Sequence, residues 1–195
     1  MYLLDADSTR TRRGGRRDGL RGPRPIKREP GTPYYRTRLG TAWLGDAREL
    51  LRRIRDESVQ AIITSPPFAL RTKKRYGNPP EDGYIEWFLP FASEFRRILK
   101  PDGSLVIEIG GAWLRGSPVR SIYHFELLVS LVRRARFHLA EEFYSFNKAK
   151  LPSPAQWVTV DRVRVKDAVT PIWWLSKSEH PRRTIGMFSS HTAPA

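Results

Sequence analysis

Hydrophobic positions follow two different spacings along the chain from about residue 40 onward. Short apolar runs rich in β-branched and aromatic residues predict strands at 41–44, 58–64, 104–109, 137–146 and 170–177. Apolar residues spaced by three and four predict amphipathic helices at 47–54, 82–100 and 121–135. This alternation of strands and helices predicts a three-layer α/β domain with a mainly parallel sheet.

The first part of the chain has no such pattern. Residues 1–38 are rich in Arg, Gly and Pro without a hydrophobic period, so we interpret them as a disordered or irregular basic arm. The folded domain is expected at 39–185 and a short tail at 186–195. At 195 residues the chain has the length of one ordinary domain with a core.

Charge indicates the kind of partner. The formal net charge is +15, which favours binding to polyanions, nucleic acid first and an acidic membrane second. The arm carries 11 Lys/Arg against 4 Asp/Glu, and the rest of the chain is also basic. The charge of the arm has two explanations, a solvated tail without function or binding to a polyanion, whereas the excess in the folded part is harder to explain by solvation alone.

Composition also excludes several chemistries. The chain has no Cys, so a thiolate nucleophile and a Cys-ligated zinc are impossible. The four His show no ligand spacing, and no metal site is expected. No apolar run approaches the length of a membrane span, and no secretory leader is recognised, so a cytoplasmic protein is expected.

The stretch "AIITSPPFAL" ends a predicted strand with two prolines. Ligands in open α/β sheets bind beyond the carboxyl ends of strands. Because Pro66 and Pro67 have no N–H, the loop is rich in acceptors, which an exocyclic amino group needs if it is to act as a nucleophile. Ser65 would offer its hydroxyl, a carbonyl of Ser65 or Pro66 would offer the second acceptor, and Phe68 would stack on the base. The alternative is an ordinary exit from a strand into a loop.

Several stretches in order carry a resemblance. "TSPPFAL" is preceded by "GDARELL" and followed by "KRYGN", "LKPDGSLVIEIGGAW" and "FNKAKLPSP". Together they resemble the beta-class amino-methyltransferases of DNA restriction-modification systems, in particular the cytosine-N(4) branch, from about Gly40 to about Pro181. The resemblance implies a Rossmann-like S-adenosylmethionine-dependent methyltransferase fold, double-stranded DNA as partner and a flipped cytosine as target.

The resemblance also implies roles for single residues. Ser65, Pro66, Pro67 and Phe68 match the catalytic motif, whose Ser form is typical of cytosine-N(4) enzymes, while Asp is commoner in adenine-N(6) enzymes. An adenine-N(6) enzyme is therefore the nearest alternative.

Further roles lie outside that motif. Asp46 is expected to contact S-adenosylmethionine near its adenine, to cap the following helix, or both. Asn147 and Pro152 are candidates for the target-base pocket, although Asn147 also suits a plain loop. The basic residues beyond the catalytic loop are expected to contact DNA phosphates, or else form a solvated loop: Arg71, Lys73, Lys74 and Arg75.

The chain departs from the family in one respect. The family holds the methionine end of its cofactor with a strand and loop of the form F-x-G-x-G, and this sequence contains none. We therefore expect an incomplete catalytic domain, through a fragment of a longer enzyme, a second polypeptide that completes the site, or a decayed gene. A catalytically silent DNA-binding protein is the alternative from another class.

Overall fold

The computed structural model describes residues 32–69, 79–114 and 116–181. The chain divides into two units, Tyr2–Leu50 and Leu51–Ala195, and each is described separately. In the first unit, β1 (Tyr35–Arg36) pairs antiparallel with β2 (Thr41–Ala42). The turn between them is closed by Thr37 N–H, which donates to the carbonyl of Gly40 at 2.8 Å. β1 thus lies inside the segment expected to be irregular, and β2 is shorter than the predicted strand.

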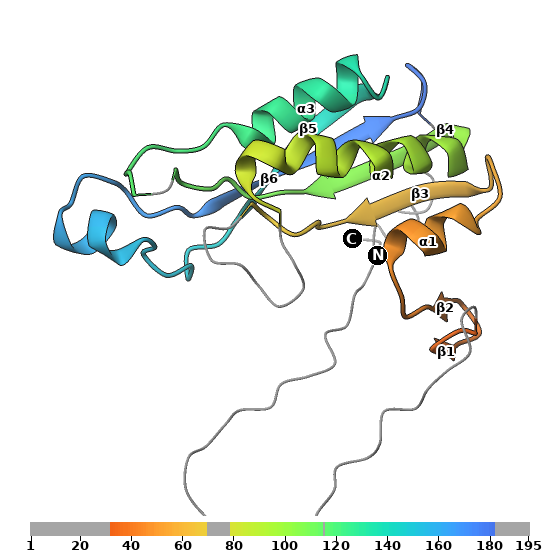
Figure 1. Ribbon diagram of the computed structural model, residues 1–195, viewed down its shortest axis with the longest axis horizontal. Helices are drawn as coiled ribbons and strands as arrows, with labels where there is room; N and C mark the ends of the chain where they lie inside the picture. The colour runs from red at the N-terminus through yellow and green to blue at the C-terminus, as the bar shows by residue number, and fades with distance from the viewer. Residues whose placement is uncertain (1–31, 70–78, 115, 182–195) are drawn as a thin grey trace, which may run out of the picture. The chain divides into compact units, whose positions relative to one another are not determined.

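The second unit is built on a four-stranded sheet with the order β3-β4-β6-β5 (Figure 1). Its strands are β3 (Val59–Thr64), β4 (Leu99–Glu108), β5 (His138–Phe146) and β6 (Val169–Ser176). Each lies close to a stretch predicted from the sequence. β4 differs most, because it begins at Leu99, directly after a helix, whereas the predicted strand begins at residue 104.

Helices α2 (Tyr84–Ile98) and α3 (Tyr123–Arg133) pack side by side on the sheet (Figure 1). Below them, the buried Leu105 and Ile107 of β4 and the buried Trp173 of β6 form part of the core. The alternation of the pleat explains why the neighbouring Val106 and Trp174 are only half-buried. A short 3-10 helix, η1 (Glu81–Gly83), leads into α2. Among the helices of the described ranges, none is both long enough and apolar enough to span a membrane.

The α/β class is confirmed, but the sheet is mixed rather than mainly parallel. Only β3 and β4 pair in parallel, whereas β4 with β6 and β5 with β6 pair antiparallel. The reason lies in the connection between β5 and β6, which holds a short π-helix, η2 (Gln156–Val160), and no long crossover helix. A parallel pair needs a crossover, so two strands in succession without one run antiparallel.

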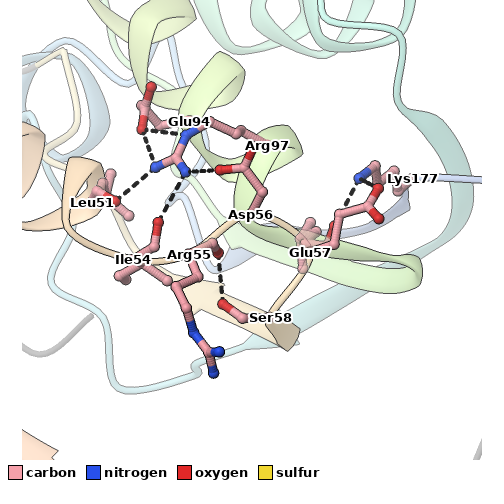
Figure 2. A network of polar contacts seen from close by, with 10 residues as sticks. Leu51, Ile54, Arg55, Asp56, Glu57, Ser58, Glu94, Arg97 and Lys177 are labelled. Carbon is pink, nitrogen blue, oxygen red and sulfur yellow. Dashed lines mark hydrogen bonds and ion pairs between the residues drawn. The ribbon is translucent and has the colours of Figure 1, made fainter.

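Arg97 of α2 ties the end of α1 (Ala47–Arg52) to the start of β3 (Figure 2). Its guanidinium donates to the carbonyl of Leu51, in the last turn of α1, and to that of Ile54, just after the helix, each at 2.9 Å. It also pairs with Glu94 at 2.7 Å and with Asp56. The Arg97 side chain therefore helps to fix the turn between α1 and β3.

Replacing Arg97 should lower stability in a graded way. In Arg97→Lys the charge remains but the planar fork is lost, so the urea midpoint should fall; in Arg97→Ala it should fall further. Urea titration followed by circular dichroism measures this. Arg133→Ala is the matched control, because Arg133 is exposed on α3 and should leave the midpoint unchanged. Equal midpoints for the wild type and Arg97→Ala would contradict the role given to Arg97.

Candidate active site

The loop Ser65–Ala69 follows β3 at its carboxyl end, as expected from the sequence. β3 runs parallel to β4, with Thr64 paired to Ile107, so the loops after the two strands leave the same edge of the sheet. The Phe68 ring lies against Gly110 in the second loop, where a Cβ atom would come within 2.7 Å of Phe68 Cε2. Glycine at 110 is thus required by the close approach of the ring.

One end of this loop is held and the other is open. The Tyr84 hydroxyl donates to the Pro67 carbonyl at 2.7 Å, and Ala69 N–H donates to the Tyr123 hydroxyl at 3.4 Å. Pro66 is buried, whereas Ser65 is exposed and its hydroxyl has no hydrogen-bond partner among the described residues. The motif thus presents Ser65 Oγ at the surface on a backbone that is fixed just downstream.

Neither of the two supporting tyrosines was singled out from the sequence. Tyr84 and Tyr123 are 0% and 1% exposed. Burial raises the pKa of Tyr84, and it raises the pKa of Tyr123 to about 12, so both phenols keep their protons at neutral pH and can donate. Tyr123 uses its proton on the Gly110 carbonyl. The only sequence signal was a Tyr at the first turn of each predicted helix, which by itself reads as core.

Asp46 belongs to the first unit and caps α1. Its carboxylate accepts from Arg48 N–H at 2.9 Å and pairs with the Arg48 guanidinium at 2.6 Å. The expected capping role is therefore confirmed. The side chains of Asp46 and Arg48 are 45% and 59% exposed. Because both can reorganise in solvent, the carboxylate fits an additional N–H donor such as an adenine amino group.

Asn147 and Pro152 lie in the connection after β5. The Asn147 side chain accepts from Ala149 N–H at 3.0 Å, and its backbone N–H donates to Ala168 at 2.8 Å. These contacts make Asn147 a turn former, which is the loop role that the sequence also allowed. Pro152 is exposed. Within the described ranges, neither residue makes a hydrogen bond to the Ser65–Ala69 loop.

The four basic residues expected to contact phosphates fall outside the described residues: Arg71, Lys73, Lys74 and Arg75. Three or more His, Asp or Glu do not gather into a metal-binding group in the part of the chain that is described.

A cluster of two tryptophans and two arginines lies in the loops and was not predicted. Trp113 follows β4 and meets Trp157 of η2 edge to face, with ring centroids 5.9 Å apart. The guanidinium groups of Arg120 and Arg164 lie 5.1 and 5.5 Å from the Trp113 ring. Arg120 also pairs with Asp167 at 3.3 Å. We call the two tryptophans and two arginines the Trp113 cluster; it joins the β5–β6 connection to the loop after β4.

Comparison with known proteins identifies a family and several relatives. The DNA methylase family model matches residues 59–192. The chain is 50% identical over 153 residues to the type II methyltransferase M.PvuII of Proteus hauseri, covering 78% of this chain and 46% of that protein. It is 40% identical over 80 residues to the type II methyltransferase M.BamHI of Bacillus amyloliquefaciens, covering 38% of this chain and 18% of that protein.

Solved structures are similar as well. The fold matches the cytosine-N4-specific PvuII DNA methyltransferase with a TM-score of 0.67 and 46% identity, over 78% of this chain and 54% of that one. It matches a DNA modification methylase of Thermus thermophilus, solved with S-adenosyl-L-methionine, with a TM-score of 0.51 and 23% identity, over 72% of this chain and 54% of that one. The chain spans about half the length of M.PvuII. On the strength of the family match, which covers most of its folded part, the chain belongs to the DNA methylase family.

Proposed function

We propose that the chain carries the base-binding half of a site-specific DNA methyltransferase that transfers a methyl group from S-adenosylmethionine to N4 of a flipped cytosine, within a restriction-modification system. The observation that carries this proposal is that tyrosine hydroxyls fix the Ser65–Ala69 loop at Pro67 and Ala69, while Ser65 is exposed. The Pro67 carbonyl is already engaged by Tyr84, while Ser65 Oγ has no partner in the described chain. The M.PvuII structure, named as cytosine-N4-specific, supports the choice of base.

The chemistry follows from where the acceptors lie. The exocyclic nitrogen of cytosine attacks poorly because its lone pair is delocalised into the ring. Ser65 Oγ and a carbonyl of Ser65 or Pro66 accept its two hydrogens and turn the lone pair out of the ring plane. S-adenosylmethionine would supply the methyl carbon as its S–C bond breaks, and one proton of the nitrogen would leave for solvent on the exposed side of Ser65. Phe68, held against Gly110, offers its remaining surface to the base.

S-adenosylmethionine supplies an electrophilic methyl group when it is bound. In our proposal the half-exposed Asp46 carboxylate accepts from the adenine amino group. Holding the two partners in line is most of what such an enzyme contributes, because the transfer is a direct displacement. No F-x-G-x-G segment occurs in the sequence, and the chain spans about half of M.PvuII. We therefore propose that further residues, on this polypeptide or a second one, complete the cofactor site.

The proposed DNA-facing surface is basic. The β5–β6 connection exposes Arg164 of the Trp113 cluster and, near it in sequence, Arg162 and Lys166. These residues would neutralise phosphates next to the flipped base. The stretch after Ala69 would add the four basic residues expected from the sequence: Arg71, Lys73, Lys74 and Arg75. The relatives are bacterial type II methyltransferases, and we propose a cytoplasmic location by analogy.

Two alternatives are kept. An adenine-N(6) methyltransferase would use the same loop, since the matching DNA methylase family model is named for both N6 and N4 methyltransferases. A silent DNA-binding protein would bind DNA without the cofactor, which the missing glycine motif favours and the intact Ser-Pro-Pro-Phe motif disfavours.

Ser65→Ala should abolish most methyl transfer. Loss of a hydrogen bond that acts on the reacting group costs about 100-fold or more in rate. The assay uses labelled S-adenosylmethionine and mixed-sequence duplex DNA, followed by digestion to nucleosides. Label is expected in N(4)-methylcytosine with the wild type, and Ser145→Ala, an exposed serine on β5, is the matched control.

The product distinguishes the alternatives. Label in N(6)-methyladenine would show that adenine, not cytosine, is the target base. Equal label from Ser65→Ala and the wild type would show that Ser65 has no role in the transfer. DNA binding without any transfer, unaffected by the cofactor, would favour the silent protein.

Arg162→Asn should reduce the salt dependence of DNA binding. Arg162 is exposed, and its φ of 55° is one that Asn tolerates well. If its charge contacts one phosphate, the slope of log K against log salt should become less steep by about 0.9. Fluorescence anisotropy at several salt concentrations measures the slope. Arg133→Asn on α3 is the control and should leave the slope unchanged. An unchanged slope for Arg162→Asn would contradict a phosphate contact by Arg162.

A further inference from the structure

The Pro66–Ala69 segment has an unusual set of polar contacts. Its two prolines have no N–H, and in the described part of the chain its backbone makes no hydrogen bond to another backbone group. Its polar contacts there are with the hydroxyls of Tyr84 and Tyr123. We propose that Tyr84 and Tyr123 are positioning residues for methyl transfer, whose hydroxyls fix the loop that presents Ser65 and Pro66 to the target amino group. This inference rests on the proposed function.

Tyr84 selects which oxygen of the loop is available. Its hydroxyl donates to the Pro67 carbonyl at 2.7 Å, a distance typical of a well-formed O–H···O bond. The Pro67 carbonyl is thereby engaged and turned toward α2. The acceptors left for a target amino group are Ser65 Oγ and the carbonyls of Ser65 and Pro66. Without the Tyr84 hydroxyl, the Pro67 carbonyl would be an unsatisfied competitor one residue away.

Tyr123 links the two loops that leave the sheet edge. Its hydroxyl accepts from Ala69 N–H at 3.4 Å and donates to the Gly110 carbonyl. One oxygen therefore joins the loop after β3 to the loop after β4. The Phe68 ring lies across the same junction, against Gly110. Tyr123 thus sets the spacing between the Ser65 acceptors and the surface of Phe68 on which the base would stack.

The two tyrosines support each other. Their rings meet edge to face at 4.8 Å, and Tyr84 also packs on Trp87 and Phe88, with centroids at 5.3 and 6.3 Å. Such packing leaves the hydroxyls little freedom, since rings enclosed on several sides cannot change rotamer without displacing neighbours. Rigid support of this kind gives a catalytic loop its accuracy, because small displacements of reacting groups cost much rate.

The test removes only the hydroxyls. Tyr84→Phe and Tyr123→Phe keep the rings and hence the core. In the methyl-transfer assay we expect kcat to fall about 10- to 100-fold in each, the loss expected from a displacement of about 1 Å. KM for DNA and for S-adenosylmethionine should stay within about twofold of the wild type, because binding surfaces are untouched. Tyr144→Phe, on the exposed strand β5, is the matched control and should keep the wild-type kcat.

A second measurement does not depend on activity. Ala69 N–H donates to the Tyr123 hydroxyl, so amide hydrogen exchange at Ala69 should be faster in Tyr123→Phe and unchanged in Tyr144→Phe. Unchanged kcat in both tyrosine variants would overturn the inference, as would a fall in kcat that only follows loss of folded protein in circular dichroism. If the wild type transfers no methyl group, the proposed function fails for this chain. Exchange at Ala69 then decides: faster exchange in Tyr123→Phe supports the positioning role, and unchanged exchange overturns it.

Discussion

A loop that contains two prolines has few N–H groups with which to hold its own shape, and the Ser65–Ala69 loop depends on hydroxyls brought to it by two helices. Tyr84 opens α2 and Tyr123 opens α3, and each hydroxyl contacts the loop backbone downstream of Ser65. The acceptors at Ser65 stay open to solvent because these contacts are made elsewhere. The backbone of this loop, which has few N–H donors of its own, is thus fixed by the two tyrosine hydroxyls.

The packing of the helices and the sheet determines where α2 and α3 begin. α2 and α3 pack on each other and on the buried side chains of β4 and β6, so that their first turns lie near the carboxyl ends of the parallel pair β3 and β4. At the other end of α2, Arg97 holds the turn before β3 through carbonyls and carboxylates. Lys177, just after β6, adds a contact to Glu57 at 2.8 Å. The start of β3, which leads to the Ser65–Ala69 loop, is therefore held by side chains from distant parts of the chain.

The β5–β6 connection shows how a polar segment becomes ordered without a core of its own. Trp157 meets Trp113 from the loop after β4, and two guanidinium groups cover the same indole. The two arginines differ in their further contacts, because Arg120 is paired with Asp167, whereas Arg164 is exposed and is held by the ring. The proposed DNA-facing residues of the β5–β6 connection are thus linked through Trp113 to the loop after β4.

The strands and helices could be predicted from the sequence because their apolar periods are strong, and the Ser65–Phe68 motif could be found because two prolines after a strand leave an acceptor-rich loop. The capping role of Asp46 could also be predicted, since it depends only on neighbours in the chain. The antiparallel position of β6 was missed, although the absence of a predicted helix between residues 147 and 169 already argued against a parallel crossover. The contacts of Tyr84 and Tyr123 with the Ser65–Ala69 loop, and of Trp113 with Trp157, became known only from the folded chain. Those contacts join residues up to 54 positions apart, and no local pattern encodes them, since an aromatic residue in a helix or loop has the same sequence signature whether it fills a core or holds a site.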